Sequence, residues 1–152
     1  MLAYPAKVEP DGDGFLVTFR DIPEAITGGD AIVEALEEAI DCLDVALAGF
    51  YADSDRDLPA ASAPRRGEYM VSPSLPYALK LSLYQAMREE GVRPAELARR
   101  LGVDHKTVSG RLLKLTYRVN VELMTRAFKV IGRTPFVQTQ KSLEPTPKRR
   151  AA

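Results

Sequence analysis

Apolar and polar residues alternate in two stretches near the start of the chain, and this pattern predicts two β-strands. The stretches are LAYPAKV at residues 2–8 and FLVTFR at residues 15–20, and they flank EPDGDG, which is dense in turn-forming residues. Strict alternation on both sides of a glycine-rich turn is typical of a β-hairpin. Because Pro5 has no backbone N–H, we expect the first strand to lie at a sheet edge or to pair on one side only.

The next segment, DIPEAITGGD at residues 21–30, predicts a short third strand and the start of a helix. Residues 25–27 favour a strand, Gly28 and Gly29 end it, and Asp30 is placed to cap the helix that follows. The helix is indicated by apolar residues at steps of four, four, three, four and three, which form one stripe. These residues are Ile32, Leu36, Ile40, Leu43, Leu47 and Phe50.

Acidic side chains take the outer positions of this helix. They are Glu34, Glu37, Glu38, Asp41 and Asp44. Acidic residues in the first turns of a helix also suit the helix dipole. A charged outer face is ordinary for an amphipathic helix, and it is equally suited to attracting a basic protein, so both interpretations stay open.

The middle of the chain predicts a loop, one more strand and the start of a second module. Residues 51–67 read as a loop, and residues 68–71 (EYMV) favour a short strand that joins the first sheet. The SPSLP segment at residues 72–76 indicates a linker. Residues 77–90 have helical periodicity, and Gly91 ends that helix.

Two short helices joined by a tight turn are predicted over residues 94–115, PAELARRLGVDHKTVSGRLLKL. The small residue Ala98 is followed four positions later by Gly102, which favours the positive φ needed where the first helix ends. Asp104 is placed to cap the second helix, and Val108 faces back toward Ala98. This order of residue types is typical of a DNA-binding helix-turn-helix, and the alternative is an ordinary helical hairpin.

In a helix-turn-helix the first turns of the second helix enter the major groove, which nominates a set of DNA-contacting residues. These are His105, Lys106 and Ser109 for base edges and Thr107, Arg111 and Lys114 for the phosphate backbone. One departure is that Arg111 stands three positions after Val108, where an inward apolar residue is usual. One extra residue in the second helix would place Leu112 inward instead, so the register after Ser109 stays open.

The end of the chain predicts one further helix and a tail. Asn120 is placed to cap a helix over residues 121–131, and Gly132 ends it. Beyond Thr134 the chain is rich in Thr, Gln, Lys, Pro and Arg and has few apolar residues. We therefore expect residues 134–152 to be a disordered basic tail.

The formal net charge of zero hides a division between the two halves of the chain. Residues 1–63 carry 14 acidic and 3 basic side chains, whereas residues 64–152 carry 7 acidic and 18 basic ones. The basic half suits a polyanion such as nucleic acid, and the acidic half suits a basic partner. A single cysteine, Cys42, and the lack of a signal pattern or a long apolar run lead us to expect a cytoplasmic protein.

An ordered set of motifs in the front half resembles the HicB-type antitoxins. The motifs are DIP at residues 21–23, TGGD at residues 27–30 and EALEEA at residues 34–39, although Glu24 stands where that family usually has glycine. Residues 67–103 are similar to the linker and DNA-binding half of the longer family members. The resemblance extends from about Tyr4 to Arg133, and the combination of motifs carries it rather than any one of them.

The resemblance implies an α+β protein of two modules. Residues 1–71 would form a small degraded RNase H-like module of βββαβ order that binds and blocks a HicA-type toxin, a small basic mRNA interferase. After the linker at residues 72–76, residues 77–133 would form an all-α helix-turn-helix domain. That domain would bind operator DNA at an inverted repeat and repress the operon, as a homodimer or a tetramer.

Toxin binding would combine an apolar and aromatic patch with the acidic helix face. The candidate residues are Tyr4, Phe15, Phe19, Glu34, Glu37, Glu38 and Asp41. An RNase H-like fold also invites a search for magnesium-binding carboxylates, for which Asp11, Asp13 and Asp21 are available. Because all three precede or occupy turns, where aspartate is common for local reasons, we expect no metal site, no cofactor and no catalysis.

A function of a different class remains as the alternative. In it the chain is a stand-alone transcription regulator, and the first module senses a small ligand or serves only for dimerisation. A gene for a short basic protein directly beside this one would favour the antitoxin, and its absence would favour the regulator.

Overall fold

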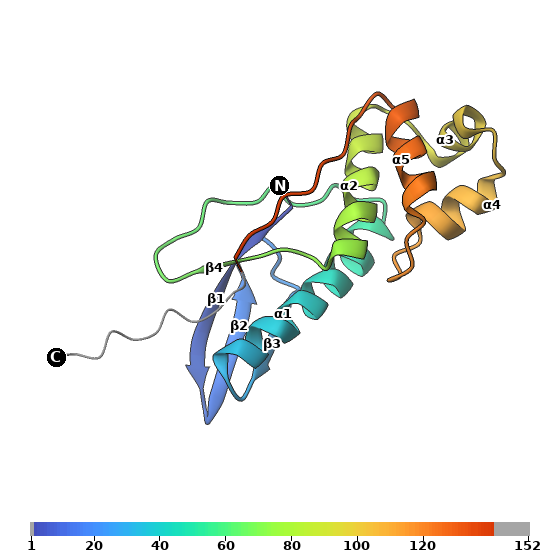
Figure 1. Cartoon of the computed structure of the whole chain (residues 1–152). Helices are drawn as coiled ribbons and strands as arrows, with labels where there is room; N and C mark the ends of the chain where they lie inside the picture. The colour runs from blue at the N-terminus through green and yellow to red at the C-terminus, as the bar shows by residue number, and fades with distance from the viewer. Residues whose placement is uncertain (1, 142–152) are drawn as a thin grey trace.

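The computed structural model describes residues 2–141 and contains one antiparallel sheet followed by a group of helices (Figure 1). The sheet has the order β3-β2-β1-β4. Its strands are β1 (Tyr4–Asp11), β2 (Gly14–Phe19), β3 (Ile26–Gly29) and β4 (Tyr69–Val71). The helices are α1 (Ile32–Ala46), η1 (Leu47–Ala52), α2 (Leu75–Glu89), α3 (Pro94–Leu101), α4 (His105–Thr107), η2 (Val108–Leu113) and α5 (Val121–Val130).

The predicted hairpin, third strand and late fourth strand are all present, but the position expected for β1 is wrong. This strand lies inside the sheet and pairs with β2 on one side and β4 on the other. The proline is tolerated because pairing with β2 begins only at Ala6, which faces Phe19, whereas Pro5 faces Met70 of β4. Pro5 itself therefore has a paired neighbour on one side only.

The apolar stripe of α1 packs on the sheet as its periodicity predicts, as far as Leu47. There the helix widens into the π-helical turn η1, which contains one more residue per hydrogen-bonded ring than an α-helix. The wider turn moves the next positions around the helix. Phe50, predicted to be inward, is 49% exposed, and Tyr51 is buried in its place.

Two further expectations for α1 are corrected. Asp30 does not cap α1, because the N-cap residue of that helix is Ala31. The backbone N–H of Asp30 instead donates to the Glu34 carboxylate at 2.9 Å. Asp44 is not on the outer face but fully buried, and its carboxylate accepts hydrogen bonds from the Ser74 N–H at 2.9 Å and the Ser74 Oγ at 2.6 Å. Ser74 is the N-cap residue of α2, so Asp44 satisfies a backbone donor where that helix begins.

Gly29 lies where β3 approaches the first turn of α1 most closely. A Cβ added there would meet the backbone N of Ala35 at 2.7 Å and its Cα at 2.9 Å. We expect Gly29→Ala to push β3 and α1 apart and to lower stability by about 1–3 kcal/mol. In thermal unfolding the midpoint should fall by about 2–4 °C for each kcal/mol.

The control for Gly29→Ala is Gly49→Ala, since Gly49 is helical and has open space around its Cα. That change should leave the unfolding midpoint unchanged or raise it slightly, because alanine favours helix more than glycine does. Equal midpoints for the two variants would contradict the close approach of β3 and α1.

A long loop between η1 and β4 is fastened to the strands by hydrogen bonds. The Tyr4 hydroxyl donates to the Pro59 carbonyl at 2.9 Å, and Asp21 accepts from both the N–H and the Oγ of Ser62. At the end of the loop, Arg20, the residue directly after β2, donates to both oxygens of Glu68, at 3.1 and 2.8 Å. The loop thus has fixed attachment points although it has no regular structure.

The pairing with Arg20 holds the pKa of Glu68 at about 2, well below its ordinary value of 4.5, with the Arg65 N–H as a second donor. A carboxylate whose pKa is lower in the folded state contributes stability above pH 4.5, and this contribution is lost as the pH falls toward about 2. We therefore expect the free energy of unfolding, measured with urea, to fall less steeply over this pH range in Glu68→Gln than in the unaltered chain. Parallel acid profiles for the variant and the unaltered chain would contradict that role.

The helices after β4 form a second buried cluster. Its members are Leu83, Ala86, Met87, Val92, Leu97, Ala98, Leu101, Val108, Leu112, Leu123, Met124, Ala127, Phe128 and Ile131. Asn120 caps α5 as expected, because its side chain accepts from the Leu123 N–H at 2.9 Å. Gly132, at φ +77°, follows the end of that helix.

Helix α2 connects the two buried clusters, since Leu81 belongs to the first and Leu83 to the second. The helix begins at Leu75, inside the segment predicted to be the linker 72–76, so that linker is shorter than expected. The early start is explained by Pro76 in the first turn and by the Asp44 carboxylate at Ser74. The division into separate folding units at residues 1–71 and 77–133 stays a prediction.

After α5 the chain runs back along α2 toward the sheet (Figure 1). Residues 134–141 have no helix or strand and are exposed, and Phe136 and Val137 line a shallow surface with Leu75 and Leu79. The remaining part of the predicted tail, residues 142–152, lies outside the described residues.

Candidate partner-binding surfaces

The outer face of α1 carries a set of exposed acidic side chains. They are Glu34, Glu37, Glu38 and Asp41. Within residues 2–141 none of the four forms an ion pair, whereas Glu68, Glu89, Glu90 and Glu96 are all paired with arginines. No described side chain therefore neutralises this negative charge of α1, which suits a basic partner.

The aromatic residues proposed to contact a partner are placed differently from the expectation. Tyr4 and Phe19 are 0% and 2% exposed in the first core, so neither side chain offers a surface, and their assignment as contact residues is wrong. Their alternation with polar residues marked the buried face of the sheet, which sequence reasoning alone did not separate from a binding face. Phe15 is half-buried against the same core and stays a candidate.

Other apolar side chains are exposed around α1, and sequence reasoning missed them. Ile26 is 59%, Val33 44% and Val45 65% exposed. Ile26 is beside α1, because its carbonyl accepts a hydrogen bond from the Cys42 thiol at 3.5 Å. The signal was present in the sequence, since Val33 and Val45 fall outside the apolar stripe among acidic positions. Large apolar side chains surrounded by charge are typical of the centre of a protein interface.

The segment between α3 and η2 has the local structure that the sequence predicted. Gly102 ends α3 with φ +68°, and the Asp104 carboxylate accepts from the Thr107 N–H at 2.6 Å. The second helix continues as the π-helical turn η2, which has one more residue per hydrogen-bonded ring than an α-helix. Val108 and Leu112 are both fully buried, so Leu112 takes the inward position and Arg111 points outward.

The six nominated DNA-contacting residues lie along one segment, α4–η2 and the residue after it. His105, Lys106, Ser109, Arg111 and Lys114 are exposed, and Thr107 is half-buried. The Ser109 hydroxyl donates to the His105 carbonyl at 3.0 Å, so it is held against its own helix. Among the described residues, Lys106, Arg111 and Lys114 form no ion pair, whereas several arginines of the neighbouring helices do.

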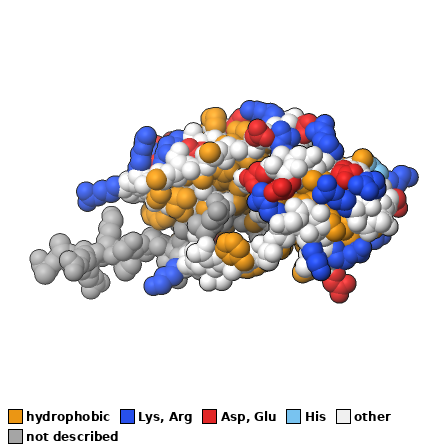
Figure 2. All heavy atoms as spheres, turned by 90° about the horizontal axis from the view of Figure 1, so that it is seen from above, with side chains coloured by type: hydrophobic (Ala, Val, Ile, Leu, Met, Phe, Trp, Pro, Cys, Tyr) orange, Lys and Arg blue, Asp and Glu red, His pale blue; other side chains and the backbone are white. Residues whose placement is uncertain are grey.

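Most other arginines of the helical half are neutralised. Arg99 and Arg100 pair with Glu96, and Arg133 pairs with Glu89 and Glu90. Figure 2 accordingly shows acidic and basic side chains interspersed over these helices. Within the described residues, Lys106, Arg111, Lys114 and Arg118 therefore form a group of exposed basic side chains without an ion pair on α4–η2 and the residues that follow.

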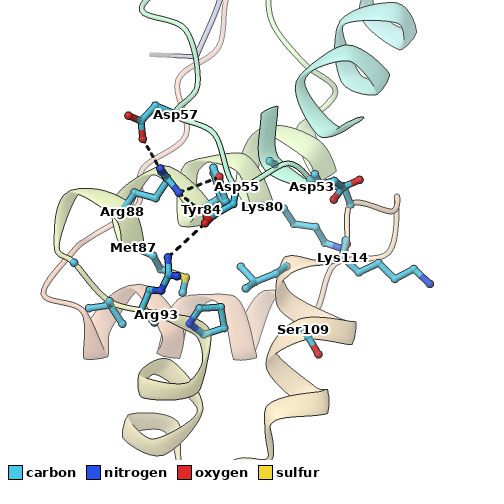
Figure 3. Close-up of a pocket in the computed structure, with 16 residues that line it drawn as sticks. Asp53, Asp55, Asp57, Lys80, Tyr84, Met87, Arg88, Arg93, Ser109 and Lys114 are labelled. Carbon is cyan, nitrogen blue, oxygen red and sulfur yellow. Dashed lines mark hydrogen bonds and ion pairs between the residues drawn. The ribbon is translucent and has the colours of Figure 1, made fainter. Parts of the chain in front are cut away.

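The two halves of the chain meet at a cavity of about 560 Å³ (Figure 3). The acidic stretch after η1 forms one wall, where Asp55 and Asp57 accept from Arg88 of α2 at 2.7 and 2.6 Å, and Arg93 lies 3.6 Å from Asp55. Exposed ion pairs of this kind contribute at most about 1 kcal/mol each. They orient the stretch against α2 and α3 more than they stabilise the fold.

A buried lysine, Lys80, lies at the wall of this cavity, and no sequence pattern predicted its burial. Its Nζ donates to the Lys114 carbonyl at 2.7 Å and to the Thr116 Oγ1 at 3.2 Å. Burial lowers the pKa of its ammonium group. The contact satisfies a carbonyl just after η2, so α2, which also contacts the first core, holds the end of that segment.

The carboxylates considered for a metal site do not converge. The Asp21 carboxylate accepts hydrogen bonds from Ser62, whereas Asp11 and Asp13 are exposed at the turn between β1 and β2. In the described part of the chain, no three His, Cys, Asp or Glu side chains lie close enough together to hold a metal ion. None of the described helices is both long and apolar enough to cross a membrane.

Comparison with known proteins places the chain among bacterial antitoxins. Residues 3–82 match the family described as HicB_like antitoxin of bacterial toxin-antitoxin systems. Antitoxin HicB 2 of Photorhabdus laumondii is 36% identical over 132 residues, which cover 87% of this chain and 92% of the relative.

Two further relatives agree over a similar length. Antitoxin HicB of Escherichia coli K12 is 31% identical, with 87% of this chain and 95% of the relative covered. Antitoxin HicB of Pseudomonas fluorescens is 35% identical, with 88% and 90% covered. The alignments therefore include the helical half as well as the sheet, and the chain belongs to the HicB-like antitoxin family of bacterial toxin–antitoxin systems.

Proposed function

We propose that this antitoxin binds a small basic ribonuclease toxin of the HicA kind through the outer face of α1, and represses its own operon through α4–η2. The observation that carries the proposal is the distribution of unneutralised charge. Within the described residues, four exposed carboxylates without an ion pair lie together on α1, and four exposed basic side chains without one lie together on α4–η2 and just beyond it. One chain thus offers separate surfaces to a basic protein and to DNA.

On the toxin side, the unpaired carboxylates would attract the partner and the exposed apolar side chains would provide the affinity. Charge accelerates encounter and selects the partner, whereas tight binding depends mainly on desolvated apolar and aromatic contacts. Ile26, Val33 and Val45 take the place of Tyr4 and Phe19 as proposed anchors, with Phe15 retained. Neutralisation would be steric, since a bound antitoxin would cover the toxin's catalytic surface.

On the DNA side, α3 and α4–η2 would act as a helix-turn-helix. The first turns of the second helix would bring His105, Lys106 and Ser109 to base edges, with Thr107, Arg111 and Lys114 nearer the phosphates. Paired copies would read an inverted repeat whose halves are about one helical turn apart. The short apolar turn from Gly102 to Asp104 and the buried Val108 support this assignment.

We extend the proposal to the remaining features of the fold. The order of three strands, a helix and a further strand supports a reduced RNase H-like module. The chain would act in the cytoplasm without catalysis of its own, as a homodimer or a tetramer.

Two assays of the full chain test the proposal. A short basic protein encoded beside this gene should arrest growth when expressed alone, and co-expression of the full chain should restore growth. A reporter behind the operon's own promoter should be repressed by the chain and released when it is absent. Arrest without rescue would contradict toxin binding, and an unaffected reporter would contradict repression.

A further inference from the structure

An open hollow of about 740 Å³ lies directly beside η2 and extends past the last of the residues nominated from the sequence. It is bounded by η2 on one side and by the loop that leads to α5 on the other. Its wall includes Gly110, Arg111, Lys114, Tyr117, Arg118 and Asn120. Three of these six residues are basic, and all three are exposed.

The two arginines of the hollow differ from the other arginines of the helical half. Between residues 77 and 133, Arg88, Arg93, Arg99, Arg100 and Arg133 form ion pairs, and Arg126 donates to the Leu101 carbonyl at 3.0 Å. Arg111 and Arg118 have neither an ion pair nor a side-chain hydrogen bond within the described residues. Two unpaired guanidinium groups at one hollow repel each other, and an anion placed between them would remove that cost.

We propose that this hollow binds a phosphate of the DNA backbone, with Arg118 as an additional contact beyond the α4–η2 segment. The inference rests on the proposed DNA binding and extends its surface past the second helix. Arg111 and Lys114 are already nominated for phosphate contact, and the wall of the hollow joins them to Arg118 in the loop before α5. The hollow therefore extends the proposed phosphate-contacting residues from the end of η2 into that loop.

The backbone around the hollow also suits a phosphate. Gly110 has no side chain and nothing lies within 4 Å of the place where its Cβ would be, so a ligand can approach the main chain there. A guanidinium group offers two parallel N–H donors to a phosphate, which a lysine cannot. An acidic surface of a second copy of the chain would compete with DNA for these arginines, and the experiment separates the two.

The test measures binding of the full chain carrying Arg118→Ala to two duplexes of equal length, one with the operon's own promoter and one of unrelated sequence. A phosphate contact carries no sequence information, so affinity should fall about tenfold on both duplexes at 0.1 M salt. The slope of log affinity against log salt should decrease by about one for each bound protomer. Arg118→Lys should retain most of the slope because it keeps the charge.

The matched control is Arg66→Ala, which removes an exposed arginine from the loop before β4 and should change neither affinity nor slope. Arg118→Ala with an unchanged slope would overturn the phosphate contact while leaving the proposed repression intact. A change in oligomeric state, seen by sedimentation without DNA, would instead assign Arg118 to a second copy and also overturn it. If the unaltered chain bound neither duplex, the proposed repression itself would fail.

Discussion

An antitoxin carrying Glu37→Lys and Glu38→Lys is expected to associate with its toxin about 10–1000-fold more slowly at low ionic strength than the unaltered chain. Both carboxylates are exposed on α1 and have no ion pair among the described residues, so their charge acts entirely on what approaches. Reversing two charges replaces attraction of a basic toxin by repulsion. Stopped-flow association at increasing salt should show the two rates converge, because salt screens exposed charges.

The matched control for this variant is Asp11→Lys with Asp13→Lys, which reverses two exposed charges at the turn between β1 and β2. Net charge changes by the same amount, but α1 is unaltered. This control should associate much faster than the α1 variant. Equal slowing by the two variants would mean that only overall charge matters and would remove α1 as the toxin-binding face.

The second large effect is expected from Lys106→Ala combined with Ser109→Ala. Each lost base contact costs about 1–3 kcal/mol, so operator affinity should fall at least about 30-fold and approach the affinity for unrelated DNA. Toxin neutralisation should be unchanged, since both residues lie on α4–η2 and away from α1 (Figure 1). Fluorescence anisotropy on the operator and growth rescue in cells measure the two activities separately.

A suitable control for the DNA variant is Thr125→Ala with Lys129→Ala, two exposed residues of α5 with a similar loss of polar and charged groups. Its operator affinity should match that of the unaltered chain. A loss of toxin neutralisation in the Lys106 and Ser109 variant, with its thermal unfolding unchanged, would contradict the division of the chain into two surfaces.

Local signals in the sequence predicted local structure well. Gly102, Asp104 and Asn120 perform their expected roles, because a positive φ or a capping oxygen depends on only a few neighbouring residues. The spacing of the second helix also indicated a change of register, since it left Arg111 where an apolar side chain is usual. The π-helical turn η2 agrees with the inward position expected for Leu112.

Features that depend on contacts between distant segments were not predictable. Asp44 had the spacing of an outer helix position, and only the arrival of Ser74 at that point makes a buried carboxylate stable. The burial of Lys80 likewise depends on the Lys114 carbonyl, which lies just after η2 and accepts a hydrogen bond from its ammonium group. Tyr4 and Phe19 showed which face of the sheet was apolar, but not whether the chain itself or a partner covers that face.

The most direct test of the proposed toxin binding is native mass spectrometry of the full chain, affinity-purified after expression from its own locus. We expect a small basic protein to accompany it at a fixed stoichiometry, and that protein should arrest growth when expressed alone. A homo-oligomer without any such partner would contradict the proposed toxin binding. The stand-alone regulator, with a ligand-sensing or dimerising first module, would then be the better description of the chain.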